Sequence, residues 1–127
     1  MLQPGLIYFL QKKVEGGDSA RVYGSGLVDV LSTPAMIAFM EKTCLELVEP
    51  YLEPGFGTVG SEVHVKHLKP TPIGDTIYCR AELIEIDGKK LTFHVEVNDS
   101  KGKVGEGTHV RYIIHTQSFM EKLNQSN

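Results

Sequence analysis

The sequence predicts an α+β fold in which an antiparallel sheet of five strands wraps around one long apolar helix. Two patterns support this prediction: a continuous helical pattern over residues 33–49, and β-type alternation both before and after it. The strand patterns cover residues 5–13, 58–68, 76–87, 91–98 and 104–115. One helix followed by a series of strands is typical of α+β proteins. The 127 residues contain no repeat or linker, so residues 1–127 are expected to form a single domain.

The predicted helix is apolar over most of its surface. Thr33-Pro34 is expected to begin it, because threonine caps free N–H groups and proline has no N–H to leave unpaired. The helix is expected to end at about Glu49, before Pro50. The apolar arc holds Met36, Ile37, Phe39, Met40, Cys44, Leu45, Leu47 and Val48. One small sheet does not cover so wide an arc, so a dimer that extends the sheet is expected.

Composition excludes several classes of function. Thirteen Lys and Arg residues are scattered among sixteen Asp and Glu residues, for a net charge of −3, which does not favour a nucleic-acid partner. No apolar stretch approaches the roughly 20 residues of a membrane span, and the first five residues lack the pattern of an export signal. We therefore expect a cytoplasmic protein with no nucleic-acid and no membrane partner.

The sequence also lacks the common signatures of nucleotide and metal sites. No GxGxxG, GKS or GKT element marks a dinucleotide or phosphate loop, and no GxSxG element marks an α/β-hydrolase. Cys44 and Cys79 have no metal-ligand spacing and are expected to be reduced thiols in the core. No pair of histidines has helical metal spacing, so neither a metal nor a cofactor is expected.

Glu41 places a carboxylate within the apolar arc of the helix. Its neighbours at helical spacing are Ile37, Cys44, Leu45 and Val48. Burial of an unpaired carboxylate lowers the free energy of unfolding by roughly several kcal/mol or raises the pKa of the group. Glu41 therefore meets a partner, lines a cavity, or reaches water at the edge of the arc.

Strand alternation separates the five histidines. His67 falls on the same face as Val63 and Val65, whereas His64 falls on the opposite face. His67 is expected to point inward at the end of its strand, either as a hydrogen-bonded core histidine or as an acid–base group. The histidines expected on the sheet surface are His94, His109 and His115.

Thr33 has two candidate roles. It is expected to cap the helix, because its hydroxyl can accept a hydrogen bond from a free N–H group of the first turn. The same hydroxyl would lie where free N–H groups and the helix dipole favour a developing oxyanion, which suits acyl transfer.

Several short motifs occur in order along the chain. They are Leu31-Ser32-Thr33-Pro34-Ala35, Met40-Glu41, Pro50-Tyr51-Leu52-Glu53-Pro54-Gly55, Thr58-Val59-Gly60, Val65-Lys66-His67, Pro70-Thr71-Pro72-Ile73-Gly74 and Gly105-Glu106-Gly107-Thr108-His109-Val110-Arg111. Over residues 18–114 the set resembles the fluoroacetyl-CoA thioesterase-like family of hotdog-fold proteins. The resemblance implies a hotdog fold, with a long central helix wrapped by a five-stranded antiparallel sheet. It also implies a homodimer or a dimer of dimers with active sites at the subunit interface.

The resemblance implies a role for each candidate residue. The family's catalytic threonine, glutamate and histidine fall on Thr33, Glu41 and His67. The family's acyl-pocket glycine falls on Gly60, and the arginine of its last strand falls on Arg111, so both are expected to contact substrate. The implied reaction uses an acyl-CoA substrate and requires neither cofactor nor metal.

The implied function is hydrolysis of a short-chain acyl-CoA thioester to the free acid and CoA. Where the family's fluorine-selective member has an aromatic lid, this chain has Tyr23, Gly24 and Leu27, so an ordinary short acyl group is the expected substrate. Two alternatives on the same fold are an acyl-CoA hydratase or dehydratase, and a protein that binds acyl-CoA without catalysis.

The spacing of two candidate residues constrains the site. Thr33 and Glu41 are eight residues apart, which is about 12 Å along a straight helix. They cannot touch if both belong to one regular helix. Either the chain bends near Thr33, or the site combines residues of two subunits.

Overall fold

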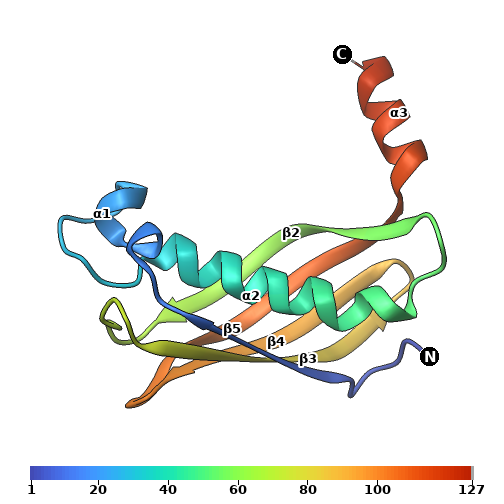
Figure 1. Ribbon diagram of the computed structural model, residues 1–127. Helices are drawn as coiled ribbons and strands as arrows, with labels where there is room; N and C mark the ends of the chain where they lie inside the picture. Colours follow the sequence, from blue (N-terminus) through green and yellow to red (C-terminus); the bar gives the residue numbers. More distant parts are fainter. Residues whose placement is uncertain (127) are drawn as a thin grey trace.

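The computed structural model describes residues 1–126 and confirms the α+β prediction. Its strands are β1 (Ile7–Lys13), β2 (Phe56–His67), β3 (Thr76–Asp87), β4 (Lys90–Asp99) and β5 (Gly102–His115). Its helices are α1 (Ala20–Tyr23), α2 (Thr33–Val48) and α3 (Thr116–Ser126), with short 3₁₀ turns η1 (Gly16–Asp18) and η2 (Glu49–Tyr51). The strands form one antiparallel sheet in the order β1-β3-β4-β5-β2. The long helix α2 lies across this sheet (Figure 1).

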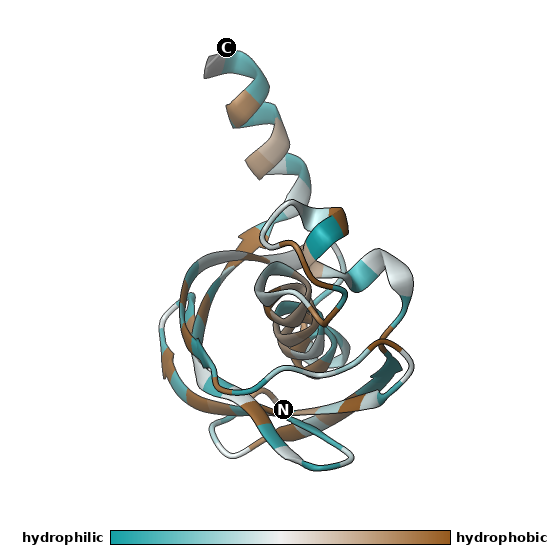
Figure 2. Cartoon of the chain, turned by 90° about the vertical axis from the view of Figure 1, so that its left-hand side faces the viewer, coloured by the Kyte–Doolittle hydropathy of each residue, from teal (hydrophilic) through white to brown (hydrophobic). Residues whose placement is uncertain are grey.

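The core lies between α2 and the concave face of the sheet, which curves around the helix in Figure 2. Met36, Met40 and Cys44 on α2 are fully buried, as are Phe93 and Val95 on the central strand β4. Burial of these apolar side chains supplies the main favourable free energy of folding. Each strand alternates between this face and the outer face, so a side chain's position in its strand decides whether it meets the helix.

The sheet has two edges, and they are formed by β1 and β2. Among residues 1–126, β2 pairs only with β5, so one side of its twelve residues has no neighbouring strand. Open edges of this length are usually covered or paired with another chain. β2 carries both Gly60 and His67, so two of the candidate site residues lie on this open edge of the sheet.

The start of α2 differs from the prediction in one respect. Ser32 caps the helix: its hydroxyl accepts a 3.1 Å hydrogen bond from the backbone N–H of Ala35, and its own backbone is extended. Thr33 is already the first helical residue, so the expectation that Thr33 is the cap was wrong. The physical reason is that the hydroxyl one residue earlier reaches the N–H three residues on, as N-cap side chains do. The Thr33 hydroxyl is therefore available for another contact.

Two further segments were not predicted. Residues 18–32 contain α1 and a loop whose Val30 forms an isolated bridge with Pro72. The C-terminal helix α3 projects away from the sheet (Figure 1). Its partly exposed apolar side chains include Phe119 and Met120. No helix among residues 1–126 is long and apolar enough to cross a membrane.

Candidate active site

Thr33 and His67 meet at the junction of α2 and β2. The Thr33 Oγ1 atom lies 2.8 Å from His67 Nδ1, within hydrogen-bonding distance. Thr33 is positioned by the capped first turn of α2, and His67 is the last residue of β2. Strand alternation was sufficient to predict the direction of the histidine: His67 is half-buried on the inner face, whereas His64 is exposed.

The second ring nitrogen of His67 has no partner within the described chain. Its Nε2 atom is buried and makes no hydrogen bond with residues 1–126. Burial, the largest effect, lowers the pKa of His67 below the ordinary value, and the nearby Lys69 backbone offsets part of this shift. His67 is therefore a neutral imidazole near pH 7, with one nitrogen bonded to a hydroxyl and the other available.

A cavity of about 370 Å³ opens beside Thr33 and His67. Much of its wall is aliphatic and comes from the loop before α2 and the segment after β2. The aliphatic lining residues include Val28, Val30, Leu31 and Leu68. The cavity thus brings a hydroxyl–imidazole pair together with apolar surface, as sites for acyl groups require.

Glu41 lies two turns further along α2, against a different part of β2. It is half-buried and makes no hydrogen bond or ion pair with residues 1–126. A Cβ atom added to Gly60 would lie 2.9 Å from Glu41 Oε2, 3.1 Å from His109 Cε1 and 3.3 Å from Arg111 Nη1. These three side chains therefore converge on Gly60, one of the two glycines of β2.

Arg111 is buried and held by specific hydrogen bonds. Its Nε donates to Thr58 Oγ1 at 2.8 Å, and its Nη2 donates to the Thr58 carbonyl oxygen at 3.0 Å. Burial, the largest effect, lowers the pKa of Arg111, while Cys44 and Glu41 act in the opposite direction. The result is a fixed guanidinium cation beside the Glu41 carboxylate.

His109 corrects the sequence analysis. It was expected on the sheet surface, but it is 1% exposed and lies on the inner face, where its ring stacks against Phe93 at a centroid distance of 6.2 Å. The strand phase is the reason: His109 alternates with Arg111 and is paired with Phe93, so it faces α2. Because Arg111 was expected to contact substrate, the alternation of β5 is the signal that could have placed His109 on the same face as Arg111. His94 is half-buried and His115 is exposed.

The candidate residues form two groups within one chain. Thr33 and His67 make one group, and Glu41, Gly60 and Arg111 make the other. Gly60 and His67 are seven residues apart on β2, which is about 23 Å of extended strand. Because α2 is one continuous helix from Thr33, the chain does not bend to bring Glu41 to Thr33. A single subunit thus separates the carboxylate from the imidazole.

The segment after β2 is anchored by a residue that the sequence analysis missed. The Asp99 side chain is 1% exposed and forms an ion pair with Lys69. It also accepts a 2.8 Å hydrogen bond from Thr71 Oγ1 and one from the Lys101 backbone N–H. Desolvation raises the pKa of Asp99, but these hydrogen bonds outweigh it and hold the pKa below its ordinary value. Asp99 fixes the segment that forms one wall of the cavity beside His67.

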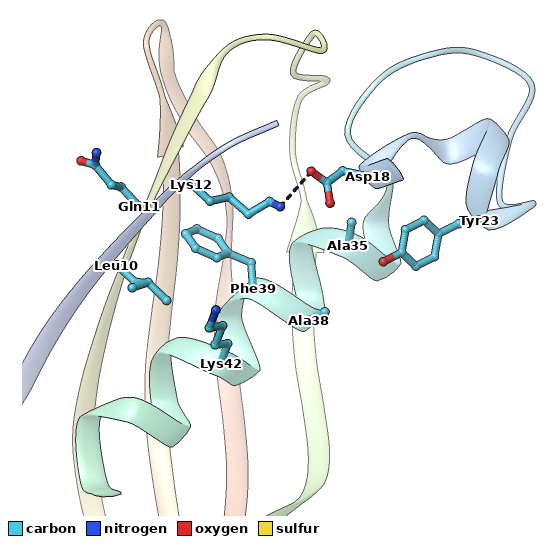
Figure 3. Close-up of a pocket in the computed structure, with 9 residues that line it drawn as sticks. All are labelled: Leu10, Gln11, Lys12, Asp18, Tyr23, Ala35, Ala38, Phe39 and Lys42. Carbon is cyan, nitrogen blue, oxygen red and sulfur yellow. Dashed lines mark ion pairs between the residues drawn. The ribbon is translucent and has the colours of Figure 1, made fainter. Parts of the chain in front are cut away.

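A second cavity, of about 260 Å³, lies between α2 and the opposite edge strand β1 (Figure 3). Its Lys12 is already paired with Asp18 at 2.9 Å, and Lys42 lies 4.0 Å from Glu46. None of the candidate catalytic residues lines this cavity. Across residues 1–126, no three His, Cys, Asp or Glu side chains come together as a metal site.

Comparisons with known proteins agree with this architecture. Residues 14–117 match the family described as fluoroacetyl-CoA-specific thioesterase. Over 97 residues the chain is 38% identical to the fluoroacetyl-CoA thioesterase of Streptantibioticus cattleyicolor, a match that covers 76% of this chain and 70% of that protein.

Solved structures are similar over nearly the whole chain. A solved fluoroacetyl-CoA thioesterase superimposes with a TM-score of 0.93 and 31% identity, covering 100% of this chain and 98% of its own. A hot-dog-like protein from Thermanaerovibrio acidaminovorans has a TM-score of 0.90 and 22% identity, covering 98% of this chain and 93% of its own. The chain therefore has the hotdog fold.

Proposed function

The chain belongs to the fluoroacetyl-CoA-specific thioesterase family, and from this membership and its site we propose that it hydrolyses short-chain acyl-CoA thioesters to the free acid and CoA. The 2.8 Å contact between Thr33 Oγ1 and His67 Nδ1, at the mouth of an apolar cavity, is the observation that supports this proposal best. A hydroxyl bonded to an imidazole is the arrangement that acyl-transfer enzymes use to activate an oxygen nucleophile.

In the proposed reaction, His67 Nδ1 takes the proton of Thr33 as its Oγ1 attacks the thioester carbonyl carbon. The C–S bond breaks, CoA leaves as the thiol with that proton, and the acyl group remains on Thr33 as an ester. Water, activated by His67, then hydrolyses the ester and restores the hydroxyl. Only one of the first three amides of α2 is available to the carbonyl oxygen. Pro34 has no N–H, and the Ala35 N–H donates to the Ser32 hydroxyl. The Thr33 N–H therefore binds the carbonyl oxygen in the proposed reaction.

The remaining partner of His67 comes from a second subunit. A His67 that acts as base on Thr33 accepts at Nδ1 and carries its proton on Nε2, and this buried Nε2 atom has no hydrogen-bond partner among residues 1–126. Glu41 is a carboxylate with no donor within the described chain. A buried N–H without a hydrogen bond costs about 1–3 kcal/mol, and a carboxylate such as Glu41 is the acceptor that would remove this cost.

Pairing of β2 with a second copy of itself supplies this contact. Antiparallel pairing at the open edge brings the His67 end of one strand towards the Gly60 end of the other, where Glu41 lies. The homodimer therefore has two sites, each made from Thr33 and His67 of one subunit and the partner subunit's Glu41. Light scattering at micromolar concentration should report twice the mass of one chain.

The substrate is an ordinary short acyl-CoA. The cavity wall beside His67 is formed by aliphatic side chains such as Val28 and Leu68, and Leu27 is 85% exposed. These side chains provide contact area for an alkyl group but no polar group that selects a fluorine atom. The free thiols of Cys44 and Cys79 support a cytoplasmic location, where cysteines stay reduced.

A thiol-trapping assay with a panel of acyl-CoAs tests the proposal. We expect release of free thiol, fastest with acyl groups of two to about four carbons. A hydratase would change the acyl chain of an unsaturated substrate without releasing thiol, and a binding protein would leave every substrate intact. Either result would contradict the proposed hydrolysis.

A further inference from the structure

We propose that His109 is a positioning residue: its neutral imidazole tethers the Arg111 guanidinium beside Glu41 and prevents the two from closing into a direct ion pair. This inference rests on the proposed function, because it assigns Glu41 to the reaction. It concerns a histidine that contacts Arg111 and approaches the same point above Gly60 as Glu41, and that has no hydrogen bond with Thr33 or His67.

The hydrogen bonds of His109 define its protonation. Its Nδ1 atom lies 2.8 Å from the Glu62 carbonyl oxygen, which can only accept, so Nδ1 carries a proton. Its Nε2 atom lies 3.2 Å from Arg111 Nη1, which can only donate, so Nε2 carries none. Both contacts are satisfied by one species, the neutral Nδ1–H tautomer.

The charged groups around His109 favour the same species. Arg111 on β5 faces its Nε2, and the Glu41 carboxylate on α2 also acts on it. A proton on Nε2 would set donor against donor and place a second cation next to Arg111. Burial, the largest effect, together with Arg111 lowers the pKa of His109, while the Glu62 backbone and Glu41 oppose the shift.

The hydrogen bond to His109 holds Nη1, the guanidinium nitrogen of Arg111 that approaches Glu41. Thr58 holds Nε and Nη2, so Nη1 is positioned by His109. Nη1 and Glu41 Oε2 lie 3.3 and 2.9 Å from the same point above Gly60, yet they do not form an ion pair. The guanidinium is planar and moves as one unit, so without the tether only the Thr58 contacts hold it, and a swing of the whole group brings Nη1 onto the carboxylate. A carboxylate paired with Nη1 no longer accepts from the partner subunit's His67.

The matched variants are His109→Leu and His109→Gln. Leucine removes the acceptor for Arg111 and should lower kcat about tenfold or more with little change in KM, because the cavity beside His67 is unaltered. Glutamine keeps an acceptor oxygen near the position of Nε2 and should recover most of kcat. His94→Leu, on the neighbouring strand β4, is the control and should stay near wild type.

A double-mutant cycle separates positioning from a general effect on stability. If His109 acts through Arg111, His109→Leu should change kcat less than about twofold on an Arg111→Met background. Independent, multiplicative losses in the double variant would overturn the proposal. So would a His109→Gln variant that folds but is as impaired as a folded His109→Leu variant.

Nitrogen chemical shifts of the wild-type imidazoles provide a test that needs neither activity nor a folded variant. We expect His109 to show the neutral Nδ1–H tautomer throughout about pH 6 to 8. An Nε2–H tautomer or a protonated ring in this range would overturn the tether. A wild-type protein with the expected tautomer but no thiol release would instead count against the proposed function and leave the tether in place.

Discussion

The hydroxyl of Thr33 lies 2.8 Å from Nδ1 of His67, whereas the helix cap that precedes it is made by Ser32. Two neighbouring hydroxyls at the start of α2 thus have separate tasks. One satisfies the backbone of the first turn, and the other is directed at the imidazole. This separation can be tested, because each hydroxyl can be removed without removing the other.

Thr33→Ala should lower turnover by more than about tenfold while leaving the melting temperature close to wild type, because the cap at Ser32 remains. Thr33→Ser keeps the hydroxyl and should retain measurable turnover. Turnover at saturating substrate and thermal melting of the same samples check this. If Thr33→Ala keeps wild-type turnover, water attacks the thioester directly and Thr33 is not the nucleophile.

Ser32→Ala is the matched control for stability. It removes the hydrogen bond to the Ala35 N–H and should lower the free energy of unfolding by about 1 kcal/mol. Where the variant is fully folded, its turnover should remain within a few-fold of wild type. A larger loss of turnover than in Thr33→Ala would show that the two tasks are not separate.

His67→Ala should reduce turnover by orders of magnitude, whereas His64→Ala, on the exposed face of the same strand, should have little effect. Equal losses in both variants would mean that the faces of β2 are assigned wrongly.

Burial lowers the pKa of His67 below 6.5, the ordinary value for histidine. The imidazole is therefore a competent base above that lowered pKa, and activity is lost as pH falls through it.

Within one subunit burial lowers the pKa of His67, whereas the partner subunit's Glu41 raises it in the proposed dimer, so Glu41→Gln should shift the acid limb of kcat/KM to lower pH. A profile from about pH 5 to pH 8, with stability checked at each pH, measures it. An acid limb at the same pH in wild type and Glu41→Gln would contradict the contact between His67 and the partner subunit's Glu41.

Gly60→Ala should lower kcat strongly, because the new Cβ would lie 2.9 Å from Glu41 Oε2 and displace the carboxylate or its neighbours. Gly57→Ala on the same strand is the control, since its Cβ would meet only Thr116 Oγ1, at 3.4 Å. Kinetics and melting of both variants measure the difference. Equal kcat values in the two variants would show that the close approach at Gly60 has no part in the reaction.

Much of the fold could be predicted from the sequence because its signals are local. Alternation predicted all five strands to within about two residues, and the apolar arc predicted α2 to within one. The helix α3 was not predicted, although Phe119 and Leu123 are spaced for one face of a helix. The Thr33-Pro34 pair predicted a cap at Thr33, but Ser32 is an equally good capping residue and its extended backbone makes it the cap.

The site was less predictable than the fold because its contacts join distant segments. Periodicity gave the inward direction of His67, but the partner of its Nδ1 depends on where β2 ends relative to α2. The position of His109 depends on its pairing with Phe93, which the β5 sequence alone does not specify. The separation of Glu41 from Thr33 was predicted from the rise of a helix. Because α2 is a regular helix from Thr33, the chain does not bend to join them, and we therefore propose a site shared by two subunits.

Subunit complementation tests the shared site most directly. Glu41→Gln and His67→Ala are co-expressed with different tags, and the heterodimer that carries one variant in each subunit is purified. It should contain one intact site, with Glu41 from one subunit and His67 from the other, and about half the turnover of the wild-type dimer. Its mirror control, wild type paired with the Glu41→Gln/His67→Ala double variant, should be inactive. A silent first heterodimer with a half-active control would contradict the shared site and assign Glu41 and His67 to the same subunit.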